Sequence, residues 1–281
     1  MCRSMTGERL SRGLRGGLRA LPVVGLGIGL WVLLVLPVVA LALASSPGEL
    51  WDALGHPKVL PALGLSLQTT ALSLGVVLVA GTPLAWWIAR SRGSVARLVE
   101  ITVELPIVIP PAVIGIALLL VFGRHGPLAP WIGSLVFTRW AVLIAQVVVA
   151  APFYVQSAVA GFRGVDDDLL LVARTLGATS RQAFLRVAVP VALPALLGGA
   201  ALCWARALGE FGATLLFAGS YEGKTQTMPL AIYATFEGDL RVAIAVALVL
   251  LLVALLTLVM ARAGRRWLAR SAASAGGGHG R

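Results

Sequence analysis

Two opposite charges lie four residues apart in an otherwise apolar stretch, and they are the most chemically suggestive pair in the chain. If the stretch is helical, Arg206 and Glu210 share one face and can form an ion pair. A lone charge in the middle of a membrane costs about 2.5–3.5 kcal/mol, so neither side chain should face lipid. Two interpretations remain open. The pair neutralises itself and joins helices, or Arg206 attracts an anion that Glu210 keeps from binding permanently.

Glycines near these charges are consistent with a packed gate, and two prolines in another stretch are candidates for a gate or pathway role. Gly209 and Gly212 flank Phe211 and would allow helices to approach closely. In another apolar stretch, Pro110 and Pro111 remove backbone donors, which lipid tolerates only where neighbours satisfy the freed carbonyls. A bend that serves packing alone remains the alternative. The candidate pathway or gate residues are Pro110, Pro111, Arg206, Gly209, Glu210, Phe211 and Gly212.

The segment 161–186 predicts two short helices that are interrupted at a glycine. Asp166 to Asp168 supply a cap and first-turn acids for the first helix, because carboxylates complement its unpaired N–H groups. Gly177 should end this helix, since glycine readily adopts the left-handed conformation. Thr179 and Gln182 have the spacing of a capping box, which begins the second helix.

This segment is either a compact turn that covers the helix ends or a rigid docking site for a partner. Its helices carry an apolar face that lipid need not cover, together with arginines. The candidate docking residues are Asp166, Asp168, Ala173, Arg174, Leu176, Gly177, Ala178 and Phe184.

Composition places these residues in an all-α integral membrane protein. Of the 281 residues, 58% are hydrophobic and 12% are charged, against about 25% charged in soluble domains. A helix needs about 20 apolar residues to cross the hydrocarbon core. Six stretches meet or approach this length: 22–44, 63–89, 105–122, 140–160, 187–208 and 242–262. The segments between them, including 90–104 and 209–241, are too short to hold a separate domain.

The distribution of cations predicts that both termini are cytoplasmic. Seventeen of the 23 Lys and Arg residues fall in the terminal segments and the even-numbered loops. We expect a cytoplasmic Arg-rich segment over 1–21, a six-helix membrane domain over 22–262 and a disordered cytoplasmic tail over 263–281. A cleaved signal peptide is the alternative for the start, but its apolar run is longer than is usual.

Several other functions find little support in the sequence. The net charge of +11 comes from short arginine runs between apolar stretches, which argues against nucleic-acid binding. Cys2 and Cys203 form no disulfide framework, the three histidines suggest no metal site, and Gly223-Lys224 lacks the remaining glycine of a phosphate-binding loop. Since no catalytic set of residues appears, an enzyme is not expected.

The segment 173–184 resembles the coupling loop of ABC-importer permeases, whose pattern is Glu-Ala-Ala, three residues and then Gly. Ala173 and Gly177 match this pattern. Leu171 and Val172 stand where the family has Glu and the first Ala, so the role of that glutamate does not carry over. The resemblance implies that this loop lies in a groove of a separate ATPase subunit and passes its closure to the membrane helices.

Four further segments resemble the molybdate permeases, a family of type I importer subunits. These segments are Leu105–Gly115, Gly123–Leu128, Ala205–Thr214 and Thr225–Tyr233. Permeases for sulfate, thiosulfate and tungstate share part of the pattern.

This resemblance implies a type I, MetI-like fold in the cell inner membrane. It also implies a homodimer with two ATPase subunits, on which ATP and Mg act, and an extracytoplasmic molybdate-binding protein. No cofactor is expected on this chain itself. An ion-coupled secondary transporter is the alternative from another class, although no internal repeat supports it.

Overall fold

The computed structural model describes residues 5–44 and 46–276, and every regular element in these ranges is a helix. The helices, in chain order, are α1 (Met5–Leu43), α2 (Pro47–Gly55), α3 (Val59–Arg90), α4 (Ser94–Val108), α5 (Pro111–Phe122), α6 (Ala129–Ile132), α7 (Arg139–Arg163), α8 (Asp167–Thr175), α9 (Ser180–Ala183), the π-turn η1 (Phe184–Ala188), α10 (Val189–Leu208), α11 (Gly212–Ala218), α12 (Met228–Phe236) and α13 (Leu240–Gly276).

Within the described residues, the six expected membrane spans correspond to five long apolar segments and one bent pair of helices. The long segments are Val24–Leu43, Val59–Arg90, Arg139–Arg163, Ser180–Leu208 and Leu240–Met260, and each is long and apolar enough to cross a membrane. The sixth candidate span consists of α4 and α5, whose axes differ by 115°. The all-helical membrane fold predicted from composition is therefore confirmed.

The expected third span, 105–122, was wrong in its shape. Helix α4 begins at Ser94, inside the segment expected to be a loop, and α5 departs sharply after Pro110. A residue that precedes proline avoids the helical conformation. Two consecutive prolines therefore hold Ile109 and Pro110 extended, with ψ of 129° and 135°. The consequence is a broken span.

The segment 209–241 was expected to be a loop between two spans, and the structure adds two short helices to this connection. It forms α11 and α12, which are too short to cross a membrane yet are packed into one end of the bundle. Phe217, Met228 and Leu230 are fully buried there. These helices form because their apolar side chains can be buried against α5, α7 and α13, which span length alone does not reveal.

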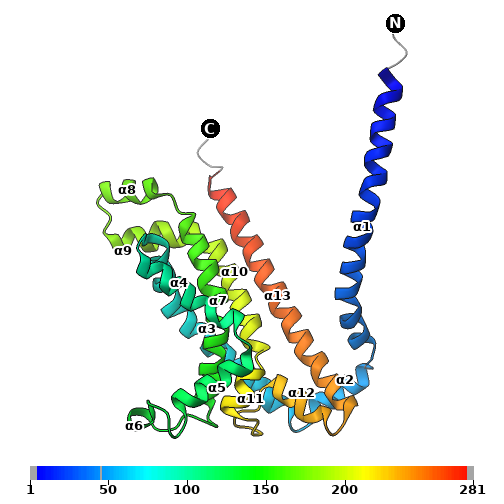
Figure 1. Cartoon of the computed structure of the whole chain (residues 1–281), viewed down its shortest axis with the longest axis vertical. Helices are drawn as coiled ribbons and strands as arrows, with labels where there is room; N and C mark the ends of the chain where they lie inside the picture. The colour runs from blue at the N-terminus through cyan, green and yellow to red at the C-terminus, as the bar shows by residue number, and fades with distance from the viewer. Residues whose placement is uncertain (1–4, 45, 277–281) are drawn as a thin grey trace.

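Helix α7 forms the centre of the bundle, with α3 and α10 packed along it (Figure 1). Small residues let these helices approach closely: a methyl group on Gly199 would lie 2.6 Å from Cβ of Ser157. Gly81 similarly faces the ring of the buried Tyr154, whose hydroxyl lies 2.6 Å from that of Thr82. Close packing of this kind stabilises helix pairs in lipid, where the hydrophobic effect contributes little.

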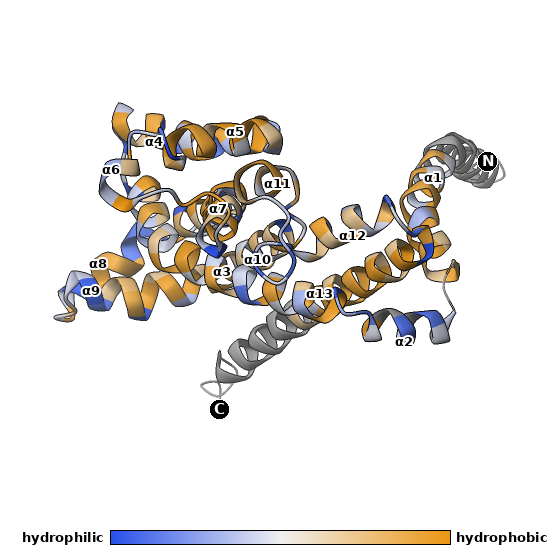
Figure 2. Ribbon diagram, turned by 90° about the horizontal axis from the view of Figure 1, so that it is seen from below, coloured by the Kyte–Doolittle hydropathy of each residue, from blue (hydrophilic) through white to orange (hydrophobic). Residues whose placement is uncertain are grey.

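Helices α8 and α9 lie at the same end of the molecule as the start of α1 and the last turns of α13, whereas α2, α6, α11 and α12 lie at the other end (Figure 1). Figure 2, a view from that other end, shows a largely hydrophobic ribbon with hydrophilic residues gathered in α2 and around α8 and α9.

The two ends of the chain extend beyond the compact bundle. None of the span Val24–Leu43 is buried. Helix α13 continues to Gly276, so the expected disordered tail over 263–281 was wrong as far as that residue. Residues 277–281, and residues 1–4 of the Arg-rich segment, lie outside the described part of the chain. Alanine and arginine, which dominate the sequence from position 261 to 274, favour helix.

We predict that the contact between α5 and α11 tolerates no side chain at Gly115. A Cβ atom there would lie 2.9 Å from the carbonyl oxygen of Ala213, a backbone atom that cannot yield easily. Gly115→Ala should therefore destabilise the protein by about 1–3 kcal/mol. The measurement is thermal unfolding in detergent.

Gly75→Ala is the matched control, because a Cβ at this α3 glycine meets no atom within 4 Å. Alanine is the better helix former, so this variant should unfold at the same or a higher temperature than the wild type. Equal midpoints for the two variants would contradict the tight contact.

Candidate pathway and coupling sites

The predicted ion pair between Arg206 and Glu210 is confirmed. Nη1 of Arg206 lies 2.7 Å from Oε2 of Glu210, and the glutamate side chain is fully buried while 27% of the arginine side chain is exposed. The other carboxylate oxygen, Oε1, accepts a hydrogen bond of 2.8 Å from the backbone N–H of Ala213. Glu210 thus neutralises a cation and also caps the first turn of α11.

The remaining predicted gate residues gather at the break between α10 and α11. Gly209 ends α10, and the Phe211 ring packs on that of Tyr233 in α12, with centroids 5.4 Å apart. A methyl group on Gly212 would lie 3.2 Å from Cβ of Pro111, so the break in one span touches the break in the other. Pro110 lies at the exposed start of α5.

Gln146 belongs to this polar region, although the sequence analysis did not single it out. It lies within α7, is 1% exposed, and its Nε2 donates to the carbonyl of Ala207 at 3.2 Å and the hydroxyl of Thr70 at 3.4 Å. One amide thereby links three spans beside Arg206. A polar side chain inside an apolar stretch is itself a signal of this role, and it was available in the sequence.

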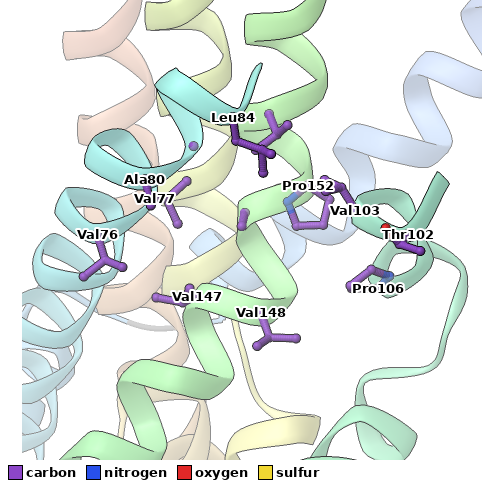
Figure 3. A pocket seen from close by; sticks show the side chains of 13 residues that line it. Val76, Val77, Ala80, Leu84, Thr102, Val103, Pro106, Val147, Val148 and Pro152 are labelled. Carbon is purple, nitrogen blue, oxygen red and sulfur yellow. The ribbon is translucent and has the colours of Figure 1, made fainter. Parts of the chain in front are cut away.

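An apolar crevice opens between α3, α4 and α7 (Figure 3). Its volume is about 240 Å³, and among its lining residues the hydroxyl of Thr102 is already bonded to the carbonyl of Val99 at 2.8 Å. The other lining side chains are aliphatic. Such a lining cannot replace the hydration of a multiply charged anion, so this crevice is not the anion pathway.

A second hollow, of about 610 Å³, lies at the C-terminal end of α5, toward the end of the molecule that is away from α8. Arg124, His125 and Ser134 supply its polar side chains. Unlike the crevice, it has a cation, Arg124, in its lining.

The predicted caps of segment 161–186 and its break at Gly177 are confirmed, and the second predicted helix is the beginning of the longer span Ser180–Leu208. Oδ1 of Asp166 accepts from the N–H of Asp168 at 3.0 Å and begins α8. At the other end Gly177 has φ of +90°. Its N–H bonds the Arg174 carbonyl, and the N–H of Ala178 bonds that of Ala173, both at 3.0 Å. These two bonds form a Schellman motif, which requires the left-handed residue at its centre.

The second short helix begins with the predicted capping box and then changes its winding. The hydroxyl of Thr179 accepts from the N–H of Gln182 at 3.3 Å, while the amide oxygen of Gln182 accepts from the N–H of Thr179 at 2.8 Å. The π-turn η1 follows, and the helix continues into α10. Pro190, which cannot donate to the carbonyl of Arg186, accounts for a local departure from α-helical bonding.

The segment has an inner and an outer face. Phe184 turns inward, where its ring packs on Trp86 and Phe162 with centroid distances of 5.0 and 5.8 Å. Leu171 and Leu176 are 61% and 83% exposed, and α8 and α9 project from the bundle. Arg174 is exposed as well, and Ala173 and Ala178 are half-buried. An apolar helix face at a polar end of the molecule is typical of a protein contact surface.

Comparison with known families agrees with this geometry. The family described as "Binding-protein-dependent transport system inner membrane component" matches residues 81–269, which include α8 and the whole region around Arg206.

Two curated relatives cover most of the chain. The molybdenum transport system permease protein ModB of Mycobacterium tuberculosis is 40% identical over 232 residues, which are 81% of this chain and 88% of the relative. The molybdate/tungstate transport system permease protein WtpB of Thermococcus kodakarensis is 35% identical over 203 residues, which are 72% of this chain and 78% of the relative.

The fold also matches a solved structure. A chain in the crystal structure of a bacterial ABC transporter involved in the import of alginate superimposes with a TM-score of 0.73 at 18% identity, covering 92% of this chain and 98% of the other. The expected type I, MetI-like permease fold is therefore confirmed. The chain belongs to the family of binding-protein-dependent ABC transport permeases, the inner-membrane components of these systems.

Proposed function

We propose that this chain is the permease subunit of an ABC importer that carries molybdate across the cytoplasmic membrane. The single observation that carries the substrate is the 40% identity, over most of both chains, with a permease named for molybdenum transport. The relative named for molybdate and tungstate makes tungstate, an anion of the same shape and charge, the second candidate. Family membership argues against a transporter driven by an ion gradient.

The working assembly in this proposal is a homodimer with two ATPase subunits and an extracytoplasmic binding protein. About a quarter of the Arg206 side chain is exposed in the monomer, which suits a pathway that a second copy completes. No ATP-binding loop occurs in the chain, so hydrolysis belongs to the partner subunits. In this proposal, ATP and Mg act on the ATPase subunits.

The same proposal places α8, α9 and both termini in the cytoplasm. The arginine-rich terminal segments and the loops at the α8 end hold most of the cations of the chain, which is the usual cytoplasmic bias. The hollow at Arg124 then faces the outside, where an anion arrives from its binding protein.

Arg206 in this proposal attracts the dianion, and Glu210 limits how tightly it is held. The two charges cancel at a distance of 2.7 Å, so an anion that approaches Arg206 competes with a fixed, fully buried carboxylate. Competition of this kind weakens binding, and a transporter must release what it binds. The hydrogen bond from the N–H of Ala213 holds the Glu210 carboxylate in place at the start of α11. If Glu210 turned away, this N–H would lose its partner.

Coupling requires that the ATPase subunits prefer one state of the permease, since a partner that binds both states equally would shift nothing. The apolar outer face of α8, with Leu171 and Leu176, gives the motor its contact surface. The Schellman turn at Gly177 fixes the angle between α8 and α9, so both helices move as one body.

Reconstitution tests the proposal directly. Proteoliposomes that contain this chain and its ATPase subunit, supplied with the matched binding protein, should accumulate radiolabelled molybdate only when ATP is present. Tungstate should compete with molybdate and sulfate should compete poorly. Uptake that proceeds without ATP, or that ignores molybdate, would refute the assignment.

We predict that neutralising the ion pair slows transport without unfolding the protein. Arg206→Gln combined with Glu210→Gln removes both charges, yet the new amide in place of the Glu210 carboxylate keeps an oxygen that can cap Ala213. Molybdate uptake should fall at least ten-fold. The unfolding temperature should remain near that of the wild type, because no unpaired charge is left buried.

Glu210→Ala is the comparison for this prediction, since it also removes the cap and leaves Arg206 unpaired. This variant should be clearly less stable. Normal uptake by the neutral double variant would show that the pair is structural only.

We predict that Leu176→Glu uncouples the chain from its motor. The side chain is 83% exposed, so the substitution leaves folding intact but places a charge in the apolar contact surface. Copurification of the ATPase subunit should drop at least ten-fold. Trp131→Gln, at the equally exposed Trp131 of α6 at the opposite end, should leave copurification unchanged. Equal recovery with both variants would place the docking surface elsewhere.

A further inference from the structure

Arg90, at the last turn of α3, gathers more contacts than its role as a cytoplasmic charge requires. Its Nη1 forms an ion pair with Asp167, in the first turn of α8. Its Nη2 donates to the carbonyls of Phe162 and Val165 at 3.3 and 2.9 Å, at the end of α7. Its guanidinium also lies 4.8 Å from the ring centroid of Trp86.

The aromatic side chains below Arg90 extend this contact to α10. Trp86 meets Phe162 edge-on at 5.3 Å and Phe184 at 5.0 Å. Phe184 begins η1, the turn between α9 and α10. A planar guanidinium can bond in its plane and stack on its face at the same time, which a lysine cannot do. One side chain therefore joins α3, α7 and α8 directly, and α10 through Trp86.

A second ion pair continues from this joint to the broken span. Arg163, at the end of α7, forms two hydrogen bonds with Glu100 of α4, of 2.9 and 2.8 Å. Helix α4 leads through the bend at Pro110 into α5, which touches α11 at Gly115. Fixed contacts thus connect the base of α8 with the residues around Glu210.

The pair between Arg90 and Asp167 contributes little to the stability of the fold. The Asp167 side chain is 73% exposed, and exposed ion pairs stabilise proteins only slightly. What this pair does is fix the first turn of α8 to the ends of α3 and α7. Besides this pair, α8 is held by the connection 164–166, by the packing of Leu170 on the core and by contacts with α9 and η1.

We propose that Arg90 is a positioning residue that transmits motion of α8 to the membrane helices, with Asp167 as its contact on α8. The proposal rests on the proposed function, in which an ATPase subunit pushes on α8. The carbonyl and aromatic contacts anchor Arg90 in the bundle, so a displacement of Asp167 moves the ends of α3 and α7 rather than bending the loop. Neither residue touches the transported anion.

The test compares Asp167→Ala, Arg90→Ala and the double variant in proteoliposomes with the ATPase subunit and binding protein. The readout is the number of molybdate ions imported per ATP hydrolysed. Each single variant should lower this ratio at least ten-fold while ATP hydrolysis continues, and the double variant should lower it no further than Arg90→Ala does. Copurification of the ATPase subunit with Asp167→Ala should equal that of the wild type, because the outer face of α8 is intact.

Arg92→Ala is the matched control, since Arg92 is an exposed arginine two residues from Arg90. It should keep the wild-type ratio. A wild-type ratio for Asp167→Ala overturns the proposal even if Arg90→Ala fails to fold, and so does a loss of ATPase copurification with that variant. A wild-type complex that imports no anion with ATP would instead overturn the proposed function, and this proposal with it.

Discussion

Polar groups buried between membrane spans are stabilised when they find partners within the protein, and this constraint shapes the region around Arg206. Glu210 shows it most clearly, because it uses one carboxylate oxygen for Arg206 and the other for the N–H of Ala213. Gln146 likewise donates a hydrogen bond to the carbonyl of Ala207. The ion pair, the Gln146 amide and the end of α10 therefore lie together, since each supplies hydrogen-bond partners that the others need.

The same constraint explains why the broken spans lie together. A helix that stops inside the membrane leaves N–H and carbonyl groups without intrahelical partners. The break between α4 and α5 lies against the break between α10 and α11, with Gly212 touching Pro111 and Gly115 touching Ala213. Each break thus packs against the other. In the proposed function, two breaks in contact can rearrange together, which is the property a gate requires.

Features that depend on neighbouring residues could be predicted from the sequence, whereas features that depend on tertiary contacts could not. The caps at Asp166 and Thr179 and the turn at Gly177 depend on neighbouring residues, and all three were predicted correctly. The ion pair at Arg206 followed from helical spacing alone. The burial of α11 and α12 did not follow, because short helices form only when α5, α7 and α13 provide a surface for them. Arg90 counted only among the cations of the segment 90–104, since its hydrogen-bond partners Phe162, Val165 and Asp167 lie more than 70 positions away.

In the proposed mechanism, one continuous span leads from the segment 161–186 to Arg206. Residues Ser180–Leu208 form a single span of 29 residues, roughly 43 Å long at 1.5 Å per residue. One end carries the capping box of α9, and the other carries Arg206 two residues before its end. A helix of this length transmits a displacement along its axis well only if any turn with irregular hydrogen bonding is supported by neighbouring side chains. Such a turn is the π-turn at Phe184–Ala188, where regular bonding is interrupted. The Phe184 ring packs there on Trp86 and Phe162. The bundle therefore supports this helix at the turn where its own hydrogen bonding is irregular.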